Sequence, residues 1–227
     1  MYKGKKVLAF IPARGGSKRI KNKNIRKLLG KPLFQYSVDI AKESKYIDDI
    51  LVSSDSIDIL DLAHKLGCIK NNVRPEEFSS DTARVIDAIC YEIGANNLDY
   101  DSLVLLQPTS PIRTVELLDG AIEEYFKTET SLITVKNTSD NPVFIRKVVN
   151  NKLQKIIDNS SDIRSQDFEK FYTIIGNIYI NNFHDLNKNT VLNENKYPFQ
   201  IADMYSVDID TEDDWKLAEQ ILNGKNN

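Results

Sequence analysis

An apolar strand runs into a basic loop in the stretch Val7-Leu-Ala-Phe-Ile-Pro-Ala-Arg-Gly-Gly-Ser-Lys-Arg-Ile-Lys-Asn-Lys-Asn24. The apolar run from Val7 to Ile11 predicts a buried strand. The loop after it combines a glycine pair with several cations. Glycines let backbone N–H groups turn toward a ligand, and Lys and Arg neutralise phosphate charge. A solvated surface loop is the alternative, but ligands of open α/β sheets bind at the carboxyl ends of strands, which favours phosphate binding. The spacing is neither a Walker A loop nor the G-x-G-x-x-G fingerprint.

Strand-like and helix-like segments alternate along the rest of the chain. Helical spacing of apolar residues predicts helices over 32–43, 56–66, 82–93, 115–126 and 211–222. Short apolar runs predict further strands over 50–53, 103–106, 131–135, 174–180 and 204–209. This order indicates an α/β fold, a mostly parallel sheet with helices on both faces. We expect a single domain over residues 1–227, from which a polar segment, 137–172, departs; an excursion of that length is functional or pairs with something.

Composition excludes several classes of protein. The chain has 227 residues, 41% hydrophobic and 28% charged, with a net charge of −3. An acidic balance argues against a nucleic-acid binder. Cys68 and Cys90 lack C-x-x-C spacing, and His64 and His184 lack metal-ligand spacing, so free thiols are expected. No signal peptide and no membrane-spanning run is recognised, so we expect a cytoplasmic protein without a membrane partner.

Two carboxylates near the C-terminus form a candidate metal site. Asp208 and Asp210 alternate at the end of the predicted strand over 204–209, so both can point to one side. Two hard carboxylates at a strand end suit Mg²⁺, which also takes substrate phosphates. The alternative is that Asp210 caps the last helix and Asp208 is solvated. A cationic phosphate loop elsewhere in the chain favours the metal.

Polar residues follow the other predicted strands. Gln107, in Leu105-Leu-Gln-Pro-Thr-Ser-Pro-Ile-Arg113, offers donors and acceptors to a polyhydroxylated ligand, and Arg113 suits either a ligand or a structural role. Thr109, Ser110 or Thr114 could cap the next helix. Asp81 and Asp55 are candidate helix caps. No G-x-S-x-G elbow or nucleophile–histidine pair is present, so acyl transfer has no support.

Together these motifs resemble the acylneuraminate cytidylyltransferases, or CMP-sialic acid synthetases. The resemblance runs in order through Ile11-Pro-Ala-Arg-Gly-Gly-Ser-Lys18, Lys23-Asn24, Arg74-Pro75, Ser80-Asp-Thr82, Leu106-Gln-Pro-Thr-Ser-Pro111, Gly176-Asn-Ile-Tyr-Ile180 and Asp208-Ile-Asp-Thr211. It implies a Rossmann-like fold and a homodimer in which segment 137–172 is a dimerisation arm. It also implies transfer of CMP from CTP to a nine-carbon 2-keto acid sugar, N-acetylneuraminate or a related nonulosonic acid, with Mg²⁺ or Mn²⁺.

The resemblance also implies roles for individual residues. Arg14 and Lys18 would hold the phosphates and, with Asp208 and Asp210 on the metal, carry catalysis. The nucleotide site would comprise Ala13, Arg14, Gly15, Gly16, Ser17, Lys18, Lys23, Asn24, Arg74, Asp81 and Thr82. The sugar would be met by Gln107, Arg164 and Tyr179.

Two departures concern the sugar. Members acting on sialic acid often carry Arg-Pro-Asn-Gly where this chain has Thr173-Ile-Ile-Gly176, and Lys after the arm proline where it has Val143. Arg164 or Arg146 could supply a substitute cation. The alternatives are therefore a nucleotidyltransferase for another sugar, such as legionaminic or pseudaminic acid, another base, or a non-catalytic sugar-nucleotide-binding protein.

Overall fold

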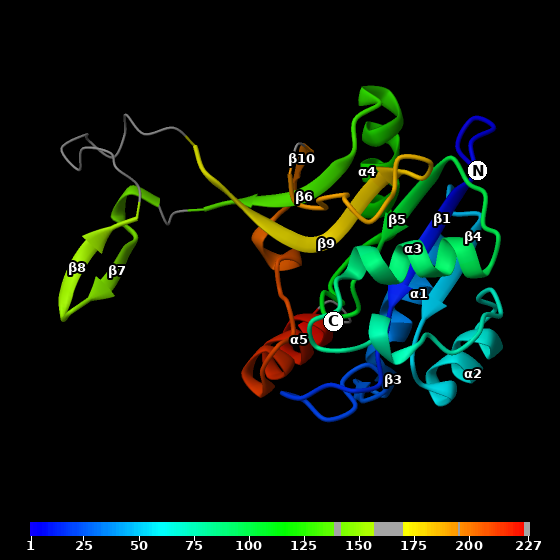
Figure 1. Ribbon diagram of the computed structural model, residues 1–227, viewed down its shortest axis with the longest axis horizontal. Helices are drawn as coiled ribbons and strands as arrows, with labels where there is room; N and C mark the ends of the chain where they lie inside the picture. The colour runs from blue at the N-terminus through cyan, green and yellow to red at the C-terminus, as the bar shows by residue number, and fades with distance from the viewer. Residues whose placement is uncertain (139–141, 157–169, 195, 225–227) are drawn as a thin grey trace.

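A six-stranded sheet with the order β10-β6-β9-β5-β1-β4 forms the centre of the molecule (Figure 1). The computed structural model describes residues 1–138, 142–156, 170–194 and 196–224. The strands of this sheet are β1 (Val7–Pro12), β4 (Asp49–Ser53), β5 (Ser102–Leu105), β6 (Leu132–Asn137), β9 (Tyr172–Asn182) and β10 (Tyr197–Gln200). Only β9 is antiparallel to its neighbours in this sheet. The mostly parallel α/β fold is therefore confirmed.

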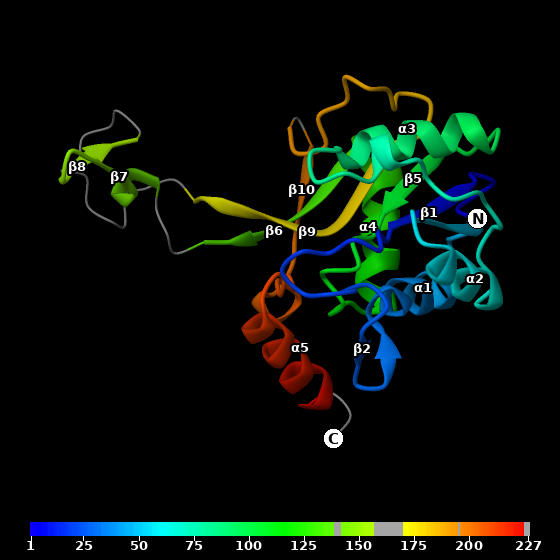
Figure 2. The ribbon, with the colours of Figure 1, turned by 60° about the horizontal axis from the view of Figure 1, so that its bottom comes forward.

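Helices cover both faces of the sheet, as predicted (Figures 1 and 2). Along β1, Val7, Ala9 and Ile11 pack with the helices of one face, while Leu8 and Phe10 pack on the other. This alternation is what an extended backbone imposes. The first face carries α1 (Leu33–Glu43), α2 (Ile57–Lys65) and α4 (Val115–Thr128), and the second carries α3 (Val85–Ala95). The last helix, α5 (Glu212–Gly224), packs through Trp215 and Ala218 in a third apolar cluster.

Several local predictions are confirmed. Thr211 and Asp214 form the predicted reciprocal cap of α5: the Thr211 N–H donates to Asp214 Oδ2 at 2.8 Å, and the Asp214 N–H donates to Thr211 Oγ1 at 3.3 Å. Thr114 caps α4 by accepting from the Leu117 N–H at 3.2 Å. Cys68 and Cys90 are free thiols. No helix in the described part of the chain is both long and apolar enough to cross a membrane.

The C-terminal strand assignment was wrong. Residues 204–209 do not form a strand: a 3-10 turn, Asp203–Tyr205, leads into irregular backbone before α5. The last strand of the sheet is instead β10, which contains Pro198 and pairs only with β6 at the edge of the sheet. Proline is tolerated in an edge strand, whose outer side needs no ladder hydrogen bond.

A register shift between β6 and β9 shapes the middle of the sheet. Ile133 pairs with Tyr179, but Val135 pairs with Ile174, so extra residues of β9 lie between these two pairings. The Thr134 hydroxyl stabilises this irregularity by donating to the carbonyl of Ile175 at 2.7 Å. Such bulges redirect side chains locally. Here the shift falls on Gly176 and Asn177.

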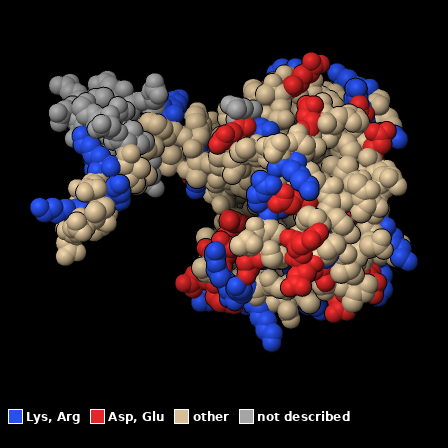
Figure 3. Space-filling model, in the orientation of Figure 1, with Lys and Arg blue, Asp and Glu red and all other residues tan. Residues whose placement is uncertain are grey.

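A hairpin of β7 (Arg146–Val149) and β8 (Lys152–Lys155) projects away from the main body (Figure 1). It lies in the segment 137–172 that the sequence predicts to be an arm, of which 139–141 and 157–169 are outside the described residues. Small elements complete the chain: β2 (Lys27–Leu28) pairs with β3 (Lys31–Pro32), and 3-10 turns lie at Glu76–Phe78 and Pro142–Phe144. Residues 142–156 contain Lys and Arg but no acidic residue (Figure 3).

Candidate active site

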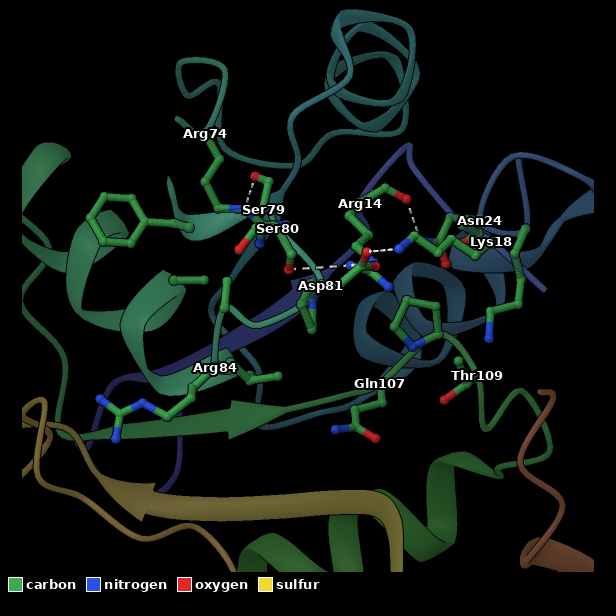
Figure 4. A pocket seen from close by; sticks show the side chains of 18 of the residues that line it. Arg14, Lys18, Asn24, Arg74, Ser79, Ser80, Asp81, Arg84, Gln107 and Thr109 are labelled. Atoms are coloured by element: carbon green, nitrogen blue, oxygen red, sulfur yellow. Dashed lines mark hydrogen bonds and ion pairs between the residues drawn. The ribbon is translucent and has the colours of Figure 1, made fainter. Parts of the chain in front are cut away.

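A cavity of about 590 Å³ opens where β1 and β5 end (Figure 4). This volume is typical of a site for a small organic ligand. It is bordered by the basic loop after β1, by the segment before α3, by the turn after β5 and by the segment before α5. Its lining residues are Pro12, Arg14, Ser17, Lys18, Arg19, Ile20, Lys23, Asn24, Arg74, Phe78, Ser79, Ser80, Asp81, Ala83, Arg84, Val85, Ala88, Gln107, Pro108, Thr109 and Asp210.

Arg14 and Lys18 meet at one carboxylate (Figure 4). Arg14 Nη1 lies 3.1 Å from Asp81 Oδ1, and Lys18 Nζ pairs with the other oxygen of Asp81. The hydrogen bond from Lys18, reinforced by Arg14, lowers the pKa of Asp81. The prediction that Asp81 caps α3 was wrong, because that helix begins later, at Val85. The two cations are therefore held close together by the Asp81 carboxylate.

The backbone of the basic loop is fixed by two other polar side chains. Buried Asn24 donates from Nδ2 to the carbonyl of Arg14 at 2.7 Å. The Gly15 N–H donates to Asp55 Oδ1, also at 2.7 Å. Asp55 therefore holds this loop, and the cap of α2 predicted for it is wrong, since Ser56 is the N-cap residue. The N–H of Gly15 therefore already has a protein partner and is not free to meet a ligand.

Asp210 closes the opposite side of the basic loop. Its carboxylate is 2.7 Å from Arg19 Nη1 and 3.2 Å from Lys23 Nζ, and Lys23 also donates to the carbonyl of Ile209 at 2.7 Å. The Ile209 N–H donates to the carbonyl of Thr109 at 2.7 Å, which ties this segment to the turn after β5. These contacts hold residues 209–210 beside the cavity, although the backbone there is irregular and pairs with no described strand of the sheet.

The second carboxylate of the predicted pair, Asp208, is exposed and does not line the cavity. Burial raises the pKa of Tyr179, and the charge of Asp208 adds to that rise. The same charge opposes the lowering of the Arg113 pKa by burial. Among the described residues, no three His, Cys, Asp or Glu side chains gather as a metal site. Carboxylates suit Mg²⁺, which commonly keeps waters and takes other ligands from substrate phosphates. Of this pair, however, only Asp210 lines the cavity, and its carboxylate is paired with Arg19 and Lys23.

Arg74 lies buried in the wall of the cavity, only 4% exposed. Its Nε donates to Ser79 Oγ at 2.9 Å (Figure 4), and its Nη1 donates to Ser53 Oγ at 3.2 Å. Burial lowers the pKa of Arg74, and the nearby carboxyl groups of Asp55 and Glu92 oppose that shift. A guanidinium group has five N–H donors. Arg74 therefore has donors beyond these two bonds with which to meet a ligand.

Gln107, just after β5, enters the cavity (Figure 4). Its side chain lies against Gly176 of the β9 bulge. The turn behind it is held by buried Arg113, which donates to the Gln107 carbonyl at 2.6 Å, to Ser37 Oγ at 2.9 Å and to Asn177 Oδ1 at 2.8 Å. Asn177 in turn donates to the Tyr205 carbonyl at 2.8 Å. Burial lowers the pKa of Arg113 to about 9. Arg113 is therefore structural and does not line the cavity.

The cavity collects part of the predicted set. It brings together Arg14, Ser17, Lys18, Lys23, Asn24, Arg74, Asp81, Gln107 and Asp210. Ala13, Gly15, Gly16, Thr82, Tyr179 and Asp208 do not line it, and Arg164 lies outside the described residues. Three further lining residues, Phe78, Ser79 and Arg84, precede α3 and were not predicted from the sequence. Phe78 and Arg84 flank the Ser80-Asp-Thr82 motif, and that proximity is the signal that could have found them.

Comparison with known sequences identifies this chain as a nucleotidyltransferase. The sequence profile described as Cytidylyltransferase matches residues 8–221, and the chain belongs to this family. It is 33% identical over 224 residues to the CMP-N,N'-diacetyllegionaminic acid synthase of Legionella pneumophila, covering 96% of each chain. It is 30% identical to a pseudaminic acid cytidylyltransferase of Campylobacter jejuni, with 94% of this chain and 95% of that protein covered. The N-acylneuraminate cytidylyltransferase of Escherichia coli is 30% identical, over 97% of this chain and 53% of that protein.

Two solved structures share the fold. CMP:2-keto-3-deoxy-manno-octonic acid synthetase complexed with CTP has a TM-score of 0.72 at 15% identity, with 97% of this chain and 99% of the other covered. 4-Diphosphocytidyl-2C-methyl-D-erythritol synthase has a TM-score of 0.66 at 12% identity, with coverages of 96% and 99%. At these identities the likeness concerns the fold alone.

Proposed function

We propose that this protein transfers CMP from CTP to the anomeric hydroxyl of a nonulosonic acid and releases pyrophosphate. The observation that carries the proposal is that one cavity of a cytidylyltransferase chain is lined both by the Arg14 and Lys18 cations and by the Gln107 amide. The cations suit a triphosphate, and the amide suits a polyhydroxylated sugar. Arg74, buried in the wall of the cavity, suits the acceptor atoms of a base.

The relatives favour a sugar of the legionaminic or pseudaminic acid type over N-acetylneuraminate. The matched synthases named for those two sugars align with this chain over nearly the full length of both proteins. The chain also has Thr173-Ile-Ile-Gly176 where the sialic acid pattern is Arg-Pro-Asn-Gly. This revises the expectation that N-acetylneuraminate is the first candidate. Between the other two sugars we propose the N,N'-diacetyllegionaminic acid named for the 33% identical relative.

Catalysis in this proposal rests on position and charge. The oxygen of the anomeric hydroxyl attacks the α-phosphorus of CTP in line and forms a bond to it. The bond from this phosphorus to the pyrophosphate oxygen breaks, and the hydroxyl proton passes to solvent. Arg14 and Lys18 would neutralise the phosphates, while Gln107 would orient the sugar. Neither His64 nor His184 lines the cavity, so no serine or cysteine there has a histidine base, and no covalent intermediate is expected. Mg²⁺ held by Asp208 and Asp210 would supply further neutralisation of phosphate charge.

We further propose that the protein is a homodimer joined through the projecting hairpin. Val148 and Leu153 are paired directly across the hairpin and are 69% and 73% exposed. Exposed apolar side chains on a two-stranded unit need another surface to cover them. The hairpin also carries basic residues without acidic ones, which suits an approach to a site that binds an anionic sugar.

The test is release of pyrophosphate from CTP and Mg²⁺ with a panel of purified sugars. N,N'-diacetyllegionaminic acid should give the highest kcat/KM, ahead of pseudaminic acid and N-acetylneuraminate. Replacing CTP with UTP should abolish turnover. Preference for N-acetylneuraminate would overturn the sugar assignment, and absence of pyrophosphate release with every sugar would overturn the activity.

A further inference from the structure

A carboxyl group lies buried behind the cavity wall. Glu92, on the inner side of α3, is only 1% exposed. It accepts hydrogen bonds from Ser53 Oγ at 2.5 Å, from Asn71 Nδ2 at 3.2 Å and from Asn96 Nδ2 at 2.8 Å. Burying a carboxyl group is costly unless such partners satisfy it. Glu92 does not line the cavity, so its own contact with a ligand cannot explain its position.

Ser53 connects this carboxyl group to the cavity. It is the last residue of β4, it is fully buried, and its hydroxyl has a single proton. That proton goes to Glu92, so the same oxygen is left to accept from Arg74 Nη1 at 3.2 Å. The direction of both bonds is thereby set. Arg74, Ser53 and Glu92 form a chain that runs from the cavity wall into the core.

We propose that Glu92 and Ser53 are positioning residues that fix the guanidinium group of Arg74 for the nucleoside part of the nucleotide. This inference rests on the proposed function of the cavity as a CTP site. The backbone N–H of Arg74 donates to the Ser54 carbonyl at 2.8 Å, and its Nε donates to Ser79 Oγ. Within the described part of the chain, Ser53 is therefore the contact that holds the Nη end of the side chain. In this proposal the triphosphate has separate contacts, Arg14 and Lys18, which meet at Asp81.

The direction of the hydrogen bonds from Arg74 through Ser53 to Glu92 makes Glu92→Gln an informative substitution. The oxygen Oε2 of Glu92 accepts from both asparagines, so in Glu92→Gln the amide oxygen belongs on that side. The new NH₂ group then faces Ser53, whose proton must turn toward Arg74, where it meets another donor. Ser53→Ala removes the connection directly and leaves both asparagine bonds to Glu92 in place. Asn96→Ala is the matched control, because it deletes a bond to Glu92 that is not on the path to Arg74.

The experiment measures binding of CTP, UTP and inorganic tripolyphosphate by titration calorimetry, without sugar, on variants whose folding is checked by circular dichroism and thermal melting. Ser53→Ala and Glu92→Gln should each weaken CTP binding about tenfold, the loss expected for one buried hydrogen bond to a charged group. They should also narrow the preference for CTP over UTP. Tripolyphosphate affinity should stay unchanged, and Asn96→Ala should bind all three ligands as the wild type does.

Two results would overturn the positioning role. One is wild-type CTP affinity in folded Ser53→Ala, which decides the matter even where Glu92→Gln fails to fold. The other is an equal loss of CTP and tripolyphosphate binding, which marks a general disturbance of the fold. A wild-type protein that binds tripolyphosphate but not CTP would instead show that the proposed function itself is wrong.

Discussion

Gly176 lies so close to Gln107 that a Cβ atom added at position 176 would stand 2.5 Å from Gln107 Oε1. The Gln107 side chain therefore packs directly against the backbone of the β9 bulge at Gly176. The contact is with the far end of a flexible side chain, which can move away. An added methyl group here would displace Gln107 without forcing the backbone to shift.

Gly176→Ala should consequently separate function from stability. We expect the KM for the sugar to rise and kcat to fall, about tenfold or more in kcat/KM, because the Gln107 amide loses its place. CTP affinity and the melting temperature should remain close to wild type. Gln107→Ala provides the matched comparison, and the double variant should be no worse than either single one. Normal sugar kinetics in Gly176→Ala would show that Gln107 does not orient the sugar.

The contact between Gly176 and Gln107 could not be predicted from the sequence, although most of the fold could. Alternating strand and helix periods predicted the sheet, the helices on both faces and the loop that carries Arg14 and Lys18. The bulge depends on the Thr134 hydroxyl meeting β9 carbonyls across the sheet, which no local pattern encodes. The strand predicted over 204–209 was wrong because tertiary contacts, and not strand pairing, hold this segment. Asn177 donates to the Tyr205 carbonyl, and Ile209 packs beside α5 without forming a strand.

Some features of the candidate site could likewise be predicted from the sequence, and others could not. Charge and glycine spacing placed Arg14, Lys18 and Gln107 at strand ends, and the cavity gathers them. The role of Asp81 could not be read from its neighbours, because a helix-cap pattern and an ion pair use the same residue type. Only the approach of the loop after β1 to the segment before α3 distinguishes them.

Removal of either cation near Asp81 should impair catalysis. Arg14→Ala and Lys18→Ala should each lower kcat/KM by about 10²–10³, the usual effect of losing one group that stabilises transition-state charge. Lys21→Ala is the matched control, since Lys21 is an exposed residue of the same loop that does not line the cavity. Circular dichroism should show intact folds. Wild-type-like efficiency in both cavity variants would rule out the phosphate role.

Charges placed on the hairpin should dissociate the proposed dimer. In Val148→Glu/Leu153→Glu, two carboxylates would have to be buried in an apolar contact, at a cost of several kcal/mol. Sedimentation velocity at micromolar concentration should show a dimer for the wild type and a monomer for this variant. Val191→Glu, at a 52% exposed position in another segment, should remain dimeric. A monomeric wild type would refute the dimer, and a dimeric double variant would refute this interface.

The two cysteines should differ in their reaction with iodoacetamide. Burial raises the pKa of the Cys68 thiol to about 11, and it raises the pKa of Cys90 as well. A raised pKa means less thiolate, so at pH 8 only about one Cys68 in a thousand is reactive. Cys90, which is half-buried, should be labelled first, and Cys68 should gain reactivity as the pH rises toward 11. Peptide mass spectrometry measures both rates. Equal rates in the folded protein, as expected in urea, would contradict this environment for Cys68.

The last prediction concerns the carboxylates of the segment before α5. Asp208→Asn and Asp210→Asn keep the shape of the side chains but remove charge that a hard cation requires. At least one variant should lose most of its activity and need more Mg²⁺ for its half-maximal rate, with partial rescue at high Mg²⁺ or by Mn²⁺. The dependence of CTP affinity on Mg²⁺, measured without sugar, should weaken in parallel. Asp210 also pairs with Arg19 and Lys23, so Arg19→Ala serves as the comparison for loss of one of these ion pairs while the carboxylate remains. A defect shared by Arg19→Ala and insensitive to metal would make Asp210 an anchor of the basic loop. If both asparagine variants keep normal turnover at limiting Mg²⁺, the metal is held elsewhere.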